Sequence, residues 1–173
     1  AITAMCFYNT RIYTGSLDCT VRVWELDEHD CVKCLEGHKG AISCVDADAF
    51  KVISASSDLQ IRIWSARSPF RCLQIVIGHQ RSVLCVHKPP GSFFATGSSD
   101  CEVKVWKILG NVKTPVKRVL CRHSLLGHGC SVTAVQMSAA EVVSGGADGK
   151  IIIWSADDGT RLRTMEAHKG SIL

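Results

Sequence analysis

The residues best suited to chemistry in this chain are histidine, serine and aspartate, which occur together at regular spacing. The first complete set is His38, Ser54 and Asp58. In many hydrolases a serine acts as nucleophile when a histidine takes its proton and an aspartate orients the histidine. A nucleophilic active site is therefore the first hypothesis to weigh.

The same residue types return along the chain in register, which argues against catalysis. Each of four aspartates follows a hydroxyl residue by four positions and precedes a tryptophan by six. The four sets are Thr14, Asp18 and Trp24; Ser54, Asp58 and Trp64; Thr96, Asp100 and Trp106; and Ser144, Asp148 and Trp154. Histidines precede the last three aspartates by 20 or 21 positions, at His38, His79 and His128. An active site is built once, so this repetition indicates a structural role.

Short strands must position these columns. In the stretch 37–64, apolar and polar residues alternate over 42–45, 51–55 and 61–63, and polar turns separate the segments. Similar segments are expected at 2–7, 11–16, 20–25 and 31–35. A period of about 40–45 residues is typical of stacked four-stranded blades. We expect repeats at about 1–36, 37–77, 78–126 and 127–166, with a further one starting at 167–173.

On these columns the chain resembles the WD-repeat β-propellers. The resemblance implies an all-β fold of four four-stranded antiparallel blades within a ring of about seven. Both ends of the chain fall inside repeats, so we expect a fragment of a longer protein whose further blades close the ring.

The resemblance also implies a role for the repeated polar residues, namely a buried hydrogen-bond network in each blade. Carried over by position, the networks are His38–Ser54–Asp58–Trp64, His79–Thr96–Asp100–Trp106 and His128–Ser144–Asp148–Trp154, with Thr14, Asp18 and Trp24 in the first repeat. The aspartate that commonly follows the tryptophan in this family is absent from every repeat. It lies outside the network, so its loss leaves the expected fold unchanged.

Function is expected at positions that vary between blades and face outward. In the family, the narrow face carries residues just after the histidine and just before the turn aspartate. The candidate partner-binding residues are therefore Lys39, Ser57, Gln80, Arg81, Ser99 and Ser131. They favour a non-catalytic scaffold or adaptor for protein partners, and the alternative is that they are merely solvated loop ends. An enzyme would need a carboxylate pair or a nucleophile, but Glu102 and Glu141 stand isolated in the sequence.

A narrower alternative is a substrate receptor of a ubiquitin ligase, because the chain is also similar in general appearance to F-box/WD proteins. Receptors of that class that read phosphorylated segments place arginine just before the turn aspartate, where guanidinium binds phosphate. Here those positions are Leu17, Ser57, Ser99 and Ala147. Trp64-Ser65-Ala66-Arg67 is similar to the Trp-Asp-x-Arg signature of cullin-adaptor propellers, with serine in place of aspartate.

The third repeat contains an insertion between Trp106 and Gly127, expected as a loop between its third and fourth strands. Its candidate binding residues are the cations Lys113, Lys117, Arg118 and Arg122. They could contact an acidic protein segment, or they could simply be solvated. The insertion has no aromatic residue on which a base could stack, which disfavours nucleic acid as a partner.

Composition limits the remaining possibilities. The net charge of +4 is mild, and no apolar run approaches the ~20 residues that span a bilayer. Among ten cysteines, Cys31 and Cys34 form a CxxC without a second ligand pair at zinc-site spacing, so no metal or cofactor is expected. We expect Cys6, Cys44 and Cys85 to occupy matching places in the first strands of their repeats. Abundant unpaired cysteine favours an intracellular protein, cytoplasmic or nuclear.

Overall fold

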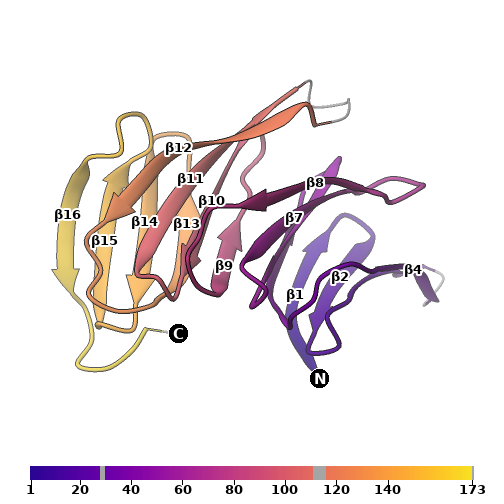
Figure 1. Cartoon of the computed structure of the whole chain (residues 1–173), viewed down its shortest axis with the longest axis horizontal. Coiled ribbons are helices and arrows are strands. Elements are labelled where there is room, and N and C mark those ends of the chain that lie inside the picture. Colours follow the sequence, from indigo (N-terminus) through magenta and orange to yellow (C-terminus); the bar gives the residue numbers. More distant parts are fainter. Residues whose placement is uncertain (28–29, 111–115, 173) are drawn as a thin grey trace.

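The structure is a computed structural model that describes residues 1–27, 30–110 and 116–172. Within these ranges the chain forms sixteen strands in four antiparallel sheets of four, each sheet built from four consecutive strands. The sheets follow one another side by side, from β1 at the indigo end to β16 at the yellow end (Figure 1). The all-β, bladed fold expected from the repeats is confirmed, and we call the sheets blades 1 to 4.

Within each blade the strands pair in sequence order. Blade 1 contains β1 (Ile2–Tyr8), β2 (Arg11–Ser16), β3 (Val21–Glu25) and β4 (Asp30–Leu35). Blade 2 contains β5 (Ile42–Ala47), β6 (Lys51–Ser56), β7 (Gln60–Ser65) and β8 (Cys72–Ile77). Blade 3 contains β9 (Val83–His87), β10 (Phe93–Ser98), β11 (Glu102–Leu109) and β12 (Arg118–Leu126). Blade 4 contains β13 (Val132–Met137), β14 (Glu141–Gly146), β15 (Lys150–Ser155) and β16 (Arg161–Glu166).

The hydrophobic core lies between the blades. One buried cluster joins blades 1 and 2, a second joins blades 2 and 3, and a third joins blades 3 and 4. The tryptophan of each later blade faces the blade before it, as Trp106 does when it packs with Ile53 and Val76 of blade 2. Each blade therefore buries its faces against its neighbours, which is how stacked repeats gain stability.

The aspartate turns share an unusual backbone conformation. The residue after each aspartate has a positive φ: 69° at Cys19, 70° at Leu59, 69° at Cys101 and 74° at Gly149. Only the last is a glycine, so three turns place a side chain in a left-handed conformation that L-residues disfavour. In all four turns Oδ1 of the aspartate accepts the N–H two residues on, which stabilises the turn.

The insertion in blade 3 differs from the expected loop. β11 and β12 are eight and nine residues long, so the described residues of the insertion lengthen both paired strands. Ile108 and Val116 are buried in the core between blades 2 and 3, and Val119 packs against it. Alternating apolar side chains thus give the extension a buried face, so it continues the sheet. Arg118 and Arg122 lie on β12, Lys117 lies just before it, and Lys113 falls outside the described residues.

The expected match among three cysteines is wrong for one of them. The strand registers pair Cys44 with Ala55 and Cys85 with Gly97, and the equivalent pair in blade 1 is Ala4 with Gly15. Cys6 lies two residues further along β1 than Ala4 and pairs with Tyr13. Burial raises the pKa of the Cys6 and Cys85 thiols to about 12, so both stay protonated at neutral pH.

Candidate functional site

The hydroxyl of Ser54 is the centre of the repeated polar set in blade 2. Its Oγ lies 2.8 Å from Nε2 of His38 and accepts a 2.9 Å hydrogen bond from Nε1–H of Trp64. Oγ accepts from Trp64, because the indole can only donate, and it donates to Nε2 of a neutral His38 because the Asp58 carboxylate takes the Nδ1–H. This arrangement requires a neutral imidazole whose proton is on Nδ1.

The other side of the imidazole faces the turn aspartate. Nδ1 of His38 lies 2.8 Å from Oδ2 of Asp58, and the same oxygen accepts the backbone N–H of Lys39 at 2.8 Å. Oδ1 accepts the N–H of Gln60 at 3.0 Å. The carboxylate therefore joins the loop that contains His38 to the turn between β6 and β7.

Blades 3 and 4 repeat this arrangement. His79 bonds Thr96 and Asp100, Trp106 donates to Thr96, and the N–H of Gln80 donates to Asp100 at 2.9 Å. In blade 4, His128 bonds Ser144 and Asp148, Trp154 donates to Ser144, and the N–H of Gly129 donates to Asp148 at 2.8 Å.

Blade 1 shows only part of this arrangement. Trp24 donates to Thr14 at 2.9 Å, while Asp18 accepts the N–H and the hydroxyl of Thr20. Among the described residues no histidine side chain links the Thr14 hydroxyl to the Asp18 carboxylate. Asp18 is also exposed, in contrast to the half-buried aspartates of the complete networks.

Burial and hydrogen bonding set the charges of these groups. Burial lowers the pKa of His38 and His79 despite the opposing effect of the neighbouring carboxylates. For Asp58 and Asp100, burial alone would raise the pKa, but the backbone and histidine hydrogen bonds outweigh it and lower the pKa. Neutral imidazole next to ionised carboxylate is the result, in agreement with the tautomer that the hydroxyl requires.

The geometry leaves these hydroxyls no route to a substrate. Ser54, Thr96 and Ser144 are each 0% exposed, and each hydroxyl already bonds a histidine and a tryptophan. A nucleophile must reach a reacting atom, so the triad-like spacing has no catalytic geometry. Among the described residues there is also no cluster of three or more His, Cys, Asp and Glu that could coordinate a metal ion.

The candidate partner-binding residues lie on the loops and turns that these networks join. Lys39, Gln80, Arg81 and Ser57 are exposed, while Ser99 and Ser131 are half-buried. Backbone bonds tie the turns to the loops: the N–H of Ser57 donates to Ala41 O and that of Ser99 to Ser82 O. We call this surface the narrow face and define it by the six candidate residues.

The basic candidates of blade 3 lie apart from the narrow face. Lys117 and Arg118 are exposed at the start of β12, and the Arg122 guanidinium donates to the carbonyl of Asp157 in blade 4. The same guanidinium lies 5.5 Å from the ring centroid of Phe93. Arg122 therefore helps to join blades 3 and 4, whereas Lys117 and Arg118 have no side-chain hydrogen bond or ion pair with the residues that the structure describes.

The buried ion pair between Lys88 and Asp48 was not predicted from the sequence. Nζ of Lys88 lies 2.8 Å from Oδ2 of Asp48, and its side chain is 0% exposed. Nζ also donates to the carbonyls of Pro89 and Gly91, so the charge is fully enclosed in the junction between blades 2 and 3. Neither residue belongs to a repeating column, and only the pairing of their turns in space brings them together.

Comparison with known proteins places the repeats in context. The family model described as "WD domain, G-beta repeat" matches residues 1–25, 29–65, 70–107 and 120–155. The chain is 24% identical to the nuclear distribution protein nudF of Aspergillus niger over 99% of this chain and 39% of that protein. It is 26% identical to the nuclear distribution protein PAC1 of Arthroderma otae over 86% of this chain and 32% of that protein. It is 25% identical to the WD repeat-containing protein pop2 of Schizosaccharomyces pombe over 96% of this chain and 28% of that protein. The chain thus spans well under half the length of these curated relatives.

Proposed function

The chain belongs to the WD domain, G-beta repeat family, and from this we propose that it is a non-catalytic scaffold whose narrow face binds protein partners. Within the described residues no helix is long and apolar enough to cross a membrane. Relatives described as nuclear distribution and WD repeat-containing proteins are compatible with a scaffold and name no enzymatic activity.

The observation that carries the proposal is the way the network fixes the backbone of variable residues. In blades 2, 3 and 4 the turn aspartate accepts the N–H of Lys39, Gln80 and Gly129 in turn. The same hydrogen bond therefore holds the backbone of each loop, while the side chain that the residue presents is a cation, an amide or no side chain. Preorganised loops with different side chains suit recognition, because little conformational entropy is lost on binding.

A charge-reversal variant tests the proposal. Lys39→Glu, Gln80→Glu and Arg81→Glu alter three exposed side chains and leave the backbone N–H donors in place. We expect proteins captured from cell extract by the unmodified chain to be lost from this triple variant in quantitative mass spectrometry. A matched control, Lys33→Glu on the outer strand β4, should retain them. Full retention by the triple variant would move the partner to another surface.

The substrate-receptor alternative has less support. The residue before each turn aspartate is Leu17, Ser57, Ser99 or Ala147, so no arginine cluster for a phosphorylated segment lies on the described narrow face. Arg81 alone could offer one such contact. Co-purification of the full-length protein with a cullin would support the alternative over the general scaffold.

We also propose that further blades flank this segment in its full-length protein. Ile42, Val83 and Val132 begin their blades fully buried against the blade before, whereas Ile2 at the equivalent position is 67% exposed. At the other side, Ile172 packs against Gly145 of blade 4, as Ile42 does against Gly15 of blade 1. Residues 167–172 thus take the position of a fifth repeat's start.

A further inference from the structure

Two grooves of similar form lie at the outer strands, one between blades 1 and 2 and one between blades 2 and 3. Trp64 lines the first and Trp106 lines the second. Each tryptophan pairs with an exposed cysteine of its own outer strand, Trp64 with Cys72 and Trp106 with Cys121. Because the two grooves have equivalent positions in the repeat, their lining side chains can be compared directly.

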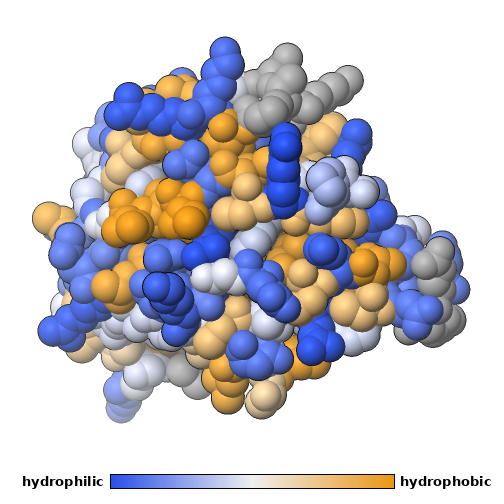
Figure 2. Space-filling view, turned by 45° about the vertical axis from the view of Figure 1, so that its right-hand side comes forward, coloured by the Kyte–Doolittle hydropathy of each residue, from blue (hydrophilic) through white to orange (hydrophobic). Residues whose placement is uncertain are grey.

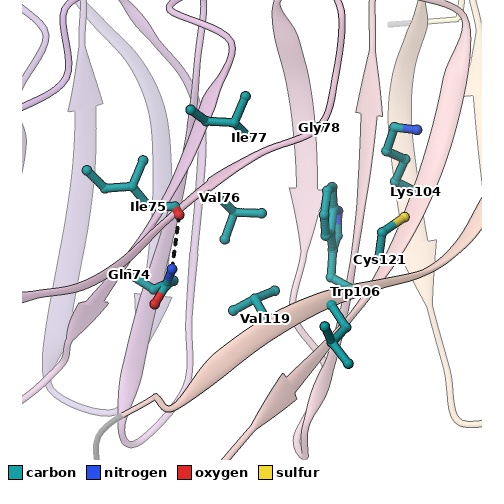
Figure 3. A pocket seen from close by; sticks show the side chains of 10 residues that line it. Gln74, Ile75, Val76, Ile77, Gly78, Lys104, Trp106, Val119 and Cys121 are labelled. Carbon is teal, nitrogen blue, oxygen red and sulfur yellow. Dashed lines mark hydrogen bonds between the residues drawn. The ribbon is translucent and has the colours of Figure 1, made fainter.

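The side chains of the two grooves differ in kind. The first is lined by charged groups of both signs, among them Lys33, Glu36 and Arg71. The second has a volume of about 290 Å3, and Val76, Val119 and Trp106 surround its centre (Figure 3). Its one charged lining residue is Lys104, which pairs with Glu102 at 2.5 Å. The groove between β8 and β12, which we call the β8 groove, thus has fewer charged side chains than the first groove.

Strand β8 itself is unusual among the described outer strands. β4, β12 and β16 each carry charged residues, whereas β8 reads Cys-Leu-Gln-Ile-Val-Ile and carries none. Ile75 and Ile77 are 43% and 71% exposed, and the residues at their places in blade 1 are Cys34 and Glu36. Apolar patches interrupt the hydrophilic surface in the space-filling view (Figure 2).

An uncharged, apolar outer strand has a physical consequence. Among the described strands β8 pairs with β7 alone, so its other edge presents backbone N–H and C=O groups to which none of these strands bonds. Proteins usually protect such edges with charges, because an open edge is a template for another strand. In many peptide-binding domains an extended segment adds to the edge and places alternate side chains in an adjoining pocket.

Charge indicates the composition of such a segment. Lys117 and Arg118 are exposed where β12 begins, immediately before the groove residue Val119. No carboxylate belongs to the groove lining, and the nearby Glu102 is already paired with Lys104. The potential at this end of the groove is therefore positive, and it favours a partner with acidic groups.

We propose that the β8 groove binds an extended protein segment that pairs with the open edge of β8. Its alternate apolar side chains insert beside Val76 and Val119, and its acidic end lies toward Lys117 and Arg118. This site rests on the scaffold function proposed above and adds a second surface, separate from the narrow face.

A defined peptide tests the proposal on the complete 173-residue chain. The probe is a fluorescein-labelled peptide of sequence Glu-Glu-Val-Thr-Val-Thr-Val-Thr, and its matched control has lysine in place of both glutamates. We expect saturable binding in fluorescence anisotropy, with about fivefold weaker binding of the lysine probe. Equal binding of both probes would overturn the charge assignment, and absence of binding up to millimolar protein would overturn the site.

Two equivalent cysteines provide the matched variants. Cys121→Glu places a carboxylate in the β8 groove, and Cys72→Glu does the same in the charged groove. Both side chains are exposed, so both variants should fold, which thermal melting checks. We expect Cys121→Glu to weaken the acidic probe at least ~10-fold and Cys72→Glu to leave it within ~2-fold. Equal effects of the two variants would contradict the assignment to this groove.

The unmodified protein gives an independent readout. Bound probe should slow alkylation of Cys121 by iodoacetamide while Cys72 reacts at an unchanged rate, as measured by mass spectrometry. Slowing of Cys121 with rising protein concentration and no probe would mean that a second copy of the chain covers the groove, and would overturn the proposal.

Strand pairing is tested separately from side-chain insertion. A β-strand presents its N–H groups to one neighbour at every second residue, so methylating the nitrogens of alternate probe residues removes one edge only. One of the two alternately N-methylated probes should lose binding and the other should retain it. Retention by both would overturn pairing with β8. The narrow-face triple variant should bind the probe normally, so failure of the narrow-face function and failure of this site remain distinguishable.

Discussion

The backbone N–H of Lys39 donates a 2.8 Å hydrogen bond to Oδ2 of Asp58, the same oxygen that bonds Nδ1 of His38. Oδ2 of Asp58 therefore links the buried network to the backbone of Lys39 on the narrow face. Changes inside the network should alter the loop that presents Lys39, whereas changes of exposed side chains on that loop should leave the network intact.

Replacing Ser54 by alanine should destabilise the fold. The change leaves Nε2 of His38 and Nε1–H of Trp64 buried without a partner, at a cost of about 1–3 kcal/mol. Urea denaturation followed by tryptophan fluorescence would measure the loss. Ser57→Ala, three residues away on the exposed turn, is the control and should change stability by less than about 0.5 kcal/mol. Similar losses from both variants would argue against a buried network centred on Ser54.

Acidification should destabilise the chain in two steps. Burial lowers the pKa of His38 and His79 in the folded state. Below the ordinary value of 6.5 these histidines therefore bind protons in the unfolded chain before they do so in the folded chain, which favours unfolding. The histidine contribution is therefore complete above pH 6.5 and is lost as pH falls toward the lowered value. The aspartate contribution is lost in turn below the ordinary value of 3.8, because the pKa of Asp58 and Asp100 is also lowered.

Thermal melting at pH 7.5 and pH 5.5 checks the first of these steps. The Tm should fall between the two values, and the double variant His38→Gln, His79→Gln should show a smaller fall. An equal fall in the double variant would assign the pH dependence to other groups.

Removing the buried cation Lys88 should cost more than removing an exposed one. Lys88→Met leaves the Asp48 carboxylate and two carbonyls without their donor in the junction of blades 2 and 3, which should cost about 3 kcal/mol. Lys150→Met removes a surface pair with Glu166 and should cost less than about 1 kcal/mol. Adding Asp48→Asn to Lys88→Met should recover part of the loss in urea denaturation. If stability does not recover, the unpaired charge of Asp48 is not the cause of the loss in Lys88→Met.

Glycine at position 59 should stabilise the turn of blade 2. Leu59 has a φ of 70°, and blade 4 already has Gly149 at the equivalent place with a φ of 74°. Relief of the left-handed backbone should raise the free energy of unfolding by up to about 1 kcal/mol, after the entropic cost of glycine. Gln60→Gly, at the start of β7, is the control and should destabilise. A loss of stability in Leu59→Gly would mean that the Leu59 side chain contributes more than the backbone strain costs.

The outer face of blade 1 should make the 173-residue chain self-associate. Met5 and Phe7 are 69% and 63% exposed on β1, and contiguous apolar surface of this kind promotes association. Sedimentation velocity should show species larger than a monomer at rising concentration. Met5→Thr with Phe7→Thr should restore the monomer. The control Leu17→Thr, in the turn between β2 and β3, should not. A monomer at all concentrations would contradict the prediction.

Much of the fold could be predicted from the sequence because its signals are local and repeated. The spacing from Asp58 to Trp64 returns in every blade, and alternation of apolar residues shows where strands lie. The resemblance to WD-repeat propellers, carried over by position, predicted His38, Asp58 and Trp64 as the network partners of Ser54. The structure brings these residues together in blades 2, 3 and 4, and in blade 1 it brings Trp24 to Thr14.

What the sequence by itself determined is thus the repeat: the strands, the turns and the polar set that each blade contains. Only the tertiary structure decided what happens between blades. Three features depend on which turns and strands become neighbours. They are the Lys88–Asp48 pair, the packing of Ile108 and Val116 between blades 2 and 3, and the groove beside β8. The physical reason is that hydrogen bonding along a strand is set by nearby residues, whereas burial and charge pairing depend on residues about 40 positions away.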